Sequence, residues 1–253
     1  ETTFLKRKIN NPIGLAAGFD KSAEVYKQLS KLGFGLIEVG TVTPEKQFGN
    51  PKPRIFRLEE DEALINRLGF NNDGLETIAD RLDRRIDTSV ALGVNIGPNY
   101  DSSSYEYDFL KCFYNIMKYC LADYVTINIS SPNTENLRDY QEESKLESLI
   151  KEINKLKKTP ISFSDMSISL KKTIGLPEKE IIDIPVFIKL SPDIKDSSIE
   201  KISEIIINQK ISGVILTNTS NINRSSLKSS NKNQIGGLSG KPIRGLSTEL
   251  IKK

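Results

Sequence analysis

The sequence predicts an α/β fold of the (β/α)₈ TIM-barrel type, with about six strand–helix units present in the chain. Short apolar segments alternate with amphipathic helical stretches, a pattern typical of parallel strands joined by helical crossovers. Polar side chains stand at the carboxyl ends of successive predicted strands, where such a barrel builds its active site. A doubly wound sheet would gather them at one switch point instead. Neither G-x-G-x-x-G after the first strand nor a P-loop occurs, so a dinucleotide-binding domain is not expected.

Six strands are predicted from short apolar runs. They span residues 13–17, 36–40, 91–96, 124–129, 185–190 and 213–218. A complete barrel of this type needs two further units. Residues 1–253 are therefore expected to form one barrel domain that is incomplete at its C-terminus.

Helices are predicted between the strands, from apolar residues three and four positions apart. They lie around residues 25–32, 75–82, 105–121, 146–156 and 197–206, and a last helix begins near Arg244. Gly33 is expected to cap the end of the first helix, and Ser197 with Glu200 fits a capping box at the start of the fifth. The segments 42–70 and 158–184 are interpreted as insertions, and 220–240 as a polar stretch.

Histidine is absent from the chain, which excludes Ser-His-Asp and Cys-His catalysis and any histidine-ligated metal. Proton transfer must then fall to another side chain, or a cofactor must carry the chemistry. Two cysteines are too few for a disulfide framework or a four-cysteine zinc site, and we expect no metal. The net charge of +3 does not by itself indicate nucleic-acid binding. No apolar run reaches the ~20 residues that span a bilayer.

Lys189 is the most unusual of the polar residues, because it lies inside the apolar strand VFIKL. A lysine there is costly to bury unless it meets an anion, although its ammonium could also reach solvent at the strand end. Its place among the other polar strand ends favours a function, such as holding a phosphate or stabilising negative charge on a ligand.

The segment INISSPNTENLR is the densest polar cluster, and ordinary turn chemistry explains Asn133 and Thr134 well but Asn128 poorly. In GFNNDG, helix capping is the preferred reading of Asn71 and Asn72. The Gly-rich segment GGLSG could approach a cofactor or be a flexible connector. The small residues of AAGFDK could let a flat ring lie close to the backbone, or form a tight turn.

Taken together, the motifs resemble the quinone-linked class of dihydroorotate dehydrogenases. The matching segments occur in order over nearly the whole chain: NPIGLAAGFDK, EVGTVTPEKQFGNPKPRIFRL, INRLGFNNDG, GVNIG, INISSPNTENLR, VFIKLSPD, GVILTNT and GGLSGKPI. The resemblance implies a barrel with FMN at the carboxyl ends of its strands, and oxidation of dihydroorotate to orotate in pyrimidine biosynthesis.

The resemblance also assigns roles around the reacting atoms. A base takes a proton from C5 of dihydroorotate while hydride leaves C6 for the flavin N5. The base matches Ser131, where the soluble class has cysteine. Thr134 or water would accept the proton from Ser131, and Phe70 would pack beside it.

Further site residues are carried over by position. FMN is expected to be lined by Ala17, Gly18, Thr41, Asn95, Asn128, Lys189, Thr217 and Gly240, with Lys189 stabilising the reduced anion. Lys21 is expected to meet the substrate carboxylate. The ring of the substrate is expected to form hydrogen bonds with Asn66, Asn128, Asn133, Asn218 and Thr219.

The resemblance further implies a quinone as electron acceptor and peripheral association with the bacterial or mitochondrial inner membrane, through an N-terminal helical pair that this sequence does not contain. Two alternatives remain open. One is another FMN barrel acting on a dihydropyrimidine, such as a tRNA dihydrouridine synthase, which usually has cysteine where Ser131 stands. The other is a barrel fragment without catalytic activity.

Overall fold

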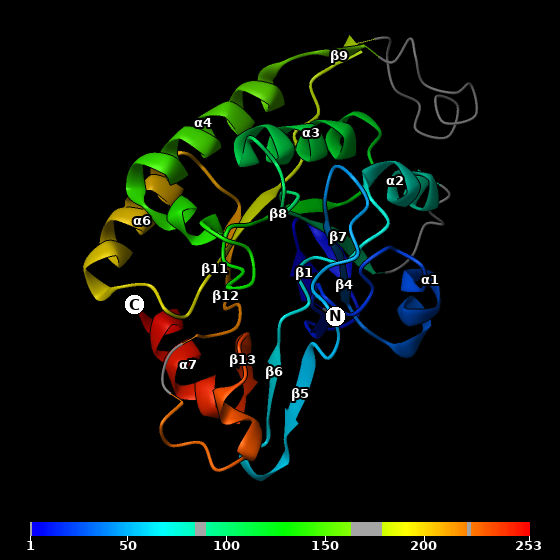
Figure 1. The fold of residues 1–253 in the computed structure, drawn as a ribbon. Coiled ribbons are helices and arrows are strands. Elements are labelled where there is room, and N and C mark those ends of the chain that lie inside the picture. Colours follow the sequence, from blue (N-terminus) through cyan, green and yellow to red (C-terminus); the bar gives the residue numbers. More distant parts are fainter. Residues whose placement is uncertain (1, 84–89, 163–178, 222–223) are drawn as a thin grey trace.

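The computed structural model describes residues 2–83, 90–162, 179–221 and 224–253. Its central element is a curled, six-stranded parallel sheet in the order β12-β11-β8-β7-β4-β3 (Figure 1). The strands are β3 (Gly14–Leu15), β4 (Leu36–Val42), β7 (Ala91–Ile96), β8 (Tyr124–Asn128), β11 (Val186–Leu190) and β12 (Gly213–Leu216). All six predicted strands are confirmed, and neighbours in sequence are neighbours in the sheet, as in the first six units of a (β/α)₈ barrel.

Helices follow each strand of this sheet along the chain. They are α1 (Tyr26–Leu29) with the 3₁₀ turn η1 (Ser30–Leu32), α2 (Leu75–Asp83), α3 (Tyr105–Lys118), α4 (Glu143–Lys158), α6 (Asp196–Asn208) and α7 (Arg244–Lys252). Gly33 ends the first with a φ of 92°, as predicted. The capping box is wrong, because α6 begins at Asp196, before Ser197, and its N-cap residue Lys195 makes no side-chain capping bond.

The hydrophobic core lies between the sheet and the helices. Every residue of β7 is buried, and Val94, Val125 and Ile188 pack with apolar residues of α3 and α4. The other face of the same strands carries polar residues towards its carboxyl end, and Asn95 pairs with Thr126 there in the parallel register. The alternation of side chains along a strand therefore separates the apolar outer face from a barrel interior that holds these polar groups.

The amino-terminal end of the barrel is closed by a hairpin of β1 (Thr2–Phe4) and β2 (Arg7–Ile9). Phe4 from this hairpin packs against Tyr124 and Phe187, with ring centroids 5.5 and 5.8 Å away. Aromatic packing fills this end, which leaves the carboxyl end of the strands as the open face.

A second sheet projects from that open face (Figure 1). It is antiparallel and contains β5 (Ile55–Leu58), β6 (Ala63–Asn66) and β13 (Gly237–Gly240) in the order β13-β6-β5. The first two strands form a hairpin inside the segment interpreted as an insertion. A connector reading of GGLSG is wrong, because four of its residues form β13.

The remaining elements are short. They are the antiparallel pair β9 (Ile161–Ser162) and β10 (Lys179–Glu180), and the 3₁₀ turns η2 (Glu59–Asp61), η3 (Leu137–Gln141), η4 (Ser230–Asn233) and η5 (Lys241–Ile243). The pair β9–β10 lies inside the predicted insertion 158–184, of which residues 163–178 are outside the described part of the chain. In the described ranges, no helix has the length and apolar character needed to cross a bilayer.

Candidate functional site

A cavity of about 350 Å³ opens at the carboxyl ends of the barrel strands. The strand ends and the loops after them form one wall, and the antiparallel sheet β5–β6–β13 contributes the other. This volume is within the range of small-molecule sites.

Most of the predicted site residues line this one cavity. They are Ala17, Gly18, Lys21, Thr41, Asn66, Phe70, Asn128, Ser131, Asn133, Lys189, Thr217, Asn218 and Thr219. Asn95, Thr134 and Gly240 are not among its lining residues. Asn95 lies in the barrel interior, with its side chain fully buried, and contacts the cavity residue Thr41.

A ladder of hydrogen bonds crosses the barrel interior below the cavity, and it begins at the buried Glu38. The Glu38 carboxylate accepts from Asn95 Nδ2 at 2.9 Å and from Thr126 Oγ1 at 2.8 Å. Asn95 Oδ1 then accepts from Thr41 Oγ1 at 2.7 Å, and Thr41 Oγ1 accepts from Asn128 Nδ2 at 3.2 Å. An ionised carboxylate can only accept, so Glu38 fixes which way each following group is oriented.

The ladder continues into the predicted substrate residues. Asn218 Nδ2 donates to Asn128 Oδ1 at 3.2 Å and to Ser130 Oγ at 3.0 Å, while Asn218 Oδ1 accepts from the backbone N–H of Thr219 at 2.8 Å. Both donor hydrogens of the Asn218 amide are therefore engaged within the protein. A ligand can reach only the remaining acceptor capacity of Asn218 unless its bonds rearrange.

Lys21 and Lys189 give the cavity its positive charge. Within the described residues, no carboxylate lies within ion-pair distance of either ammonium group, and neither donates a hydrogen bond to the protein. Burial, with the nearby charges of Arg54 and Lys189, lowers the pKa of Lys21 to about 8. A buried ammonium group on Lys189 and a partly buried one on Lys21, neither paired with a protein anion, make a site that favours an anionic ligand.

Ser131 is buried in the turn that follows β8. Its Oγ accepts the backbone N–H of Asn133 at 3.3 Å, which holds the hydroxyl in place and stabilises negative charge on its oxygen. The side chain of Asn133 donates to the Asn66 backbone carbonyl of β6 at 3.2 Å. This contact ties the turn to the opposite wall of the cavity.

Phe70 adopts a left-handed backbone, with φ of 50°, and its ring packs against the backbone at Gly97. A β-carbon at Gly97 would lie 2.9 Å from that ring, so glycine is needed for the contact. The ring lines the same cavity as Ser131 and supplies part of its apolar surface.

The neighbouring asparagines do not act as predicted. Asn72 accepts the backbone N–H groups of Gly74 and Thr43, and so ties the turn before α2 to the loop after β4. The Oδ1 atom of Asn71 is buried and has no hydrogen-bond partner in the described residues, so a capping role for Asn71 is wrong.

Several cavity residues were missed by the sequence reasoning. They are Ile55, Leu64, Leu68, Gly69, Pro132, Ser239 and Ile243. The signal that could have found the first two is the pair of short segments IFRL and ALIN around a charged turn, which is a hairpin pattern.

The cavity has features that suit a flat, polar ring. Gly18 has a φ of 108°, and a β-carbon there would lie 3.6 Å from Lys21 Nζ, inside the space between the two residues. Lys189 provides a buried cation, and Thr41, Asn128 and Thr217 provide hydrogen-bonding groups. This combination of a cation and neutral hydrogen-bonding groups fits an organic cofactor with carbonyl groups. Among the described residues, no group of three acidic or cysteine side chains could hold a metal ion.

Comparison with known proteins gives one consistent family. The family model described as dihydroorotate dehydrogenase matches residues 1–253. A protein named dihydroorotate dehydrogenase (quinone) from Christiangramia forsetii is 44% identical over 97% of this chain and 65% of its own length. One of the same name from Bartonella tribocorum is 43% identical over 97% of this chain and 63% of its own length. The chain thus spans slightly less than two thirds of these relatives.

Solved structures agree with these relatives. A ligand-free DHODH from Eimeria tenella has a TM-score of 0.87 and 37% identity, over 99% of this chain and 70% of that one. A DHODH from the same organism in complex with ferulenol has a TM-score of 0.84 and 38% identity, over 97% of this chain and 66% of that one.

Proposed function

The chain belongs to the dihydroorotate dehydrogenase family, and we propose that it oxidises dihydroorotate to orotate in pyrimidine biosynthesis, with FMN as cofactor and a quinone as the final electron acceptor. The observation that carries the proposal is the meeting of Ser131, Lys21 and Lys189 in one cavity. Ser131 is the candidate base, Lys21 the partner of the substrate carboxylate, and Lys189 a second cation. Bound FMN supplies the acceptor for the hydride of the substrate.

Ser131 is proposed to remove the substrate proton. A serine hydroxyl is a weak base, so its Oγ must pass its own proton onward as it takes the new one. Water or Thr134 can accept that proton, and Thr134 would have to approach the cavity to do so. The N–H of Asn133 stabilises charge that develops on the Ser131 oxygen, and Phe70 keeps bulk water from it.

Lys21 is proposed to bind the carboxylate of dihydroorotate. The side chains of Asn66, Asn128, Asn133, Asn218 and Thr219 are proposed to orient its ring amides. Amide side chains can both donate and accept, which suits a ring with N–H and C=O groups in alternation. Because both Asn218 hydrogens are engaged, its contribution is as an acceptor of a ring N–H.

FMN is proposed to lie against the small residues Ala17 and Gly18. Thr41, Asn128, Lys189 and Thr217 are the cavity residues proposed to bond it, and Gly240 approaches it through its backbone. Asn95 acts one step further away, because it orients Thr41. Lys189 balances negative charge on the ring system.

The proposal of a quinone acceptor is supported by the names of the relatives, and that of peripheral association with the bacterial or mitochondrial inner membrane by the class to which they belong. No nucleic-acid partner is proposed.

Anaerobic titration of the purified protein tests the proposal. FMN-loaded protein should be yellow, lose its visible flavin absorbance on addition of dihydroorotate, and regain it on addition of a soluble quinone. Protein that cannot be loaded with FMN, or whose flavin stays oxidised with dihydroorotate, would contradict the proposal. The first of these outcomes would favour a module without catalytic activity.

A further inference from the structure

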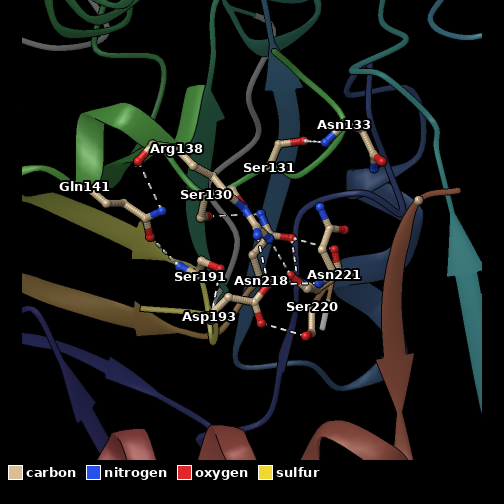
Figure 2. A network of polar contacts seen from close by, with 12 residues as sticks. Ser130, Ser131, Asn133, Arg138, Gln141, Ser191, Asp193, Asn218, Ser220 and Asn221 are labelled. Atoms are coloured by element: carbon tan, nitrogen blue, oxygen red, sulfur yellow. Dashed lines mark hydrogen bonds and ion pairs between the residues drawn. The ribbon is translucent and has the colours of Figure 1, made fainter. Parts of the chain in front are cut away.

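We propose that Arg138 and Asp193 form a positioning pair, which holds the turn carrying Ser131 and the loop carrying Asn218 and Thr219 at a fixed spacing across the cavity. The pair is the centre of the network in Figure 2. The purpose of this spacing rests on the proposed function. The spacing fixes the position of the proposed base, Ser131, relative to the residues that orient the substrate.

Arg138 uses each of its three guanidinium nitrogens on a different loop. Nε donates to the Ser130 carbonyl at 3.1 Å, Nη1 to Asp193 Oδ2 at 2.8 Å, and Nη2 to the Thr219 carbonyl at 2.9 Å. These acceptors follow β8, β11 and β12. Three neighbouring units of the barrel are therefore joined at their carboxyl ends through one side chain.

Asp193 completes the connection from the other side. Its Oδ1 accepts from Ser220 Oγ at 2.6 Å, and its Oδ2 accepts from the backbone N–H of Asn221 at 2.8 Å as well as from Arg138. Its side chain is only 9% exposed, so solvent screens these contacts little. The carboxylate thus holds the loop after β12 at two points beyond Thr219.

A neighbouring side chain reinforces the same geometry. Gln141, in the turn η3 that also carries Arg138, accepts the backbone N–H of Ser191 at 2.8 Å. The hydroxyl of Ser191 in turn accepts the backbone N–H of Asp193 at 3.1 Å. The position of Asp193 relative to η3 is therefore fixed independently of the ion pair.

Neither member of the pair lines the cavity. Arg138 bonds the carbonyl of Ser130, directly before the proposed base, and the carbonyl of Thr219, itself a proposed substrate residue. Its effect must therefore pass through the backbone. Lysine offers a single ammonium in place of the planar fork, so it cannot satisfy the three acceptors in this arrangement.

The test compares Arg138→Ala, Arg138→Lys and Asp193→Asn with Arg7→Ala as the matched control, all as FMN-loaded protein. Arg7 is exposed to a similar extent as Arg138 and forms an ion pair with Asp123, 3.0 Å long, at the amino-terminal end of the barrel. Two measurements are made: backbone hydrogen exchange of residues 130–134 and 217–221, and the rate of flavin reduction by saturating dihydroorotate in single turnover.

The three variants at the pair should each accelerate exchange in both segments, while exchange in β4 and β7 stays as in the wild type. Arg138→Ala should slow flavin reduction by about 10- to 100-fold, as expected for a misplaced reacting group, with FMN affinity changed less than about 3-fold. Arg138→Lys should resemble Arg138→Ala, because the role requires the planar guanidinium group with its three donor nitrogens. Arg7→Ala should leave both segments and the reduction rate unchanged.

Exchange that stays unchanged in either segment would overturn the proposal, as would a reduction rate equal to that of Arg7→Ala. Asp193→Asn retains the shape of the side chain. If Arg138→Ala does not fold, the hydrogen-exchange result is therefore taken from Asp193→Asn. Failure of the wild-type protein to reduce its flavin would contradict the proposed function alone, because hydrogen exchange reports the spacing without any reaction.

Discussion

Lys21, from the loop after β3, and Lys189, on β11, reach one cavity from near opposite edges of the sheet, and the charge of Lys189 contributes to the lowered pKa of Lys21. Burial makes the largest contribution, followed by Arg54. A carboxylate that enters the cavity relieves the repulsion and restores the preference of Lys21 for its charged form.

This relationship predicts how ligand affinity depends on pH. With a pKa of about 8, Lys21 of the ligand-free protein is charged below pH 8 and loses its proton above it. The affinity for orotate should therefore be highest below pH 8 and fall by up to about 10-fold for each pH unit above. Calorimetric titrations between pH 6.5 and 9.5 measure this slope.

Lys21→Ala should bind orotate weakly and without that slope, while FMN affinity changes much less. Lys151→Ala, on the outer helix α4, should retain the slope. Equal losses of orotate and FMN affinity in Lys21→Ala would contradict its assigned role.

The lowered pKa of Lys21 also affects folding stability. Between pH 8 and 10.5 the unfolded chain binds more protons than the folded protein, so Lys21 lowers the free energy of unfolding below pH 8, and this effect disappears towards pH 10.5.

Ser131→Ala should slow flavin reduction by dihydroorotate by about 10²- to 10⁴-fold, because the variant retains no group to take the substrate proton. FMN binding should be retained, since Ser131 is not among the proposed cofactor residues. Stopped-flow absorbance under anaerobic conditions measures the rate. Ser148→Ala, at an exposed position of α4, is the control. Reduction of Ser131→Ala at the wild-type rate would show that another group is the base.

Glu38→Gln should weaken FMN binding although Glu38 does not line the cavity. The neutral amide keeps an acceptor oxygen for only one of the two ladder donors, Asn95 Nδ2 and Thr126 Oγ1, and places a donor opposite the other. Loss of one such charge-assisted bond lowers the free energy of unfolding by about 1.5–3 kcal/mol. Denaturant unfolding and fluorescence titration with FMN measure the two effects. The exposed Glu24→Gln should change neither, and an unaltered FMN affinity in Glu38→Gln would mean that the ladder does not orient the cofactor residues.

Gly237→Ala should lower the free energy of unfolding by about 1–3 kcal/mol. A β-carbon at Gly237 would lie 1.9 Å from Thr219 Oγ1 and 3.0 Å from Pro132 Cγ, so β13 or both loops must move. Gly245→Ala is the matched control, because nothing lies within 4 Å of its β-carbon position and it stands in α7. That change should raise stability by about 0.5–1 kcal/mol through helix propensity. Thermal unfolding separates the two, and equal midpoints would contradict the close contact.

The parts of the molecule that follow from local patterns could be predicted from the sequence. Buried parallel strands such as 91–96 are continuous apolar runs, and their boundaries agree with β7. The predicted cavity residues Lys21, Ser131 and Lys189 come together because parallel strands all end at the same face.

Contacts between distant segments were not predictable in this way. The segment GGLSG has too little apolar pattern to show that it pairs with β6, because the partner is far away in the chain. The internal bonds of Asn218 depend on the position of Ser130, which is set by the packing of β8 beside β11 and β12. Arg138 reads as one more charge in a polar turn until the three loops that it joins have been placed.

The wall formed by β13 also has a consequence for the order of events during synthesis. Ser239 contacts Leu64 across a sequence separation of 175 residues, so the wall cannot form when β5 and β6 leave the ribosome. Such a distant pairing closes late in folding. Until residues 237–240 arrive, one wall of the cavity is missing, and we expect Lys21 and Lys189 to remain in contact with water. Ligand capture is therefore expected to follow, and not to guide, the assembly of the earlier barrel units.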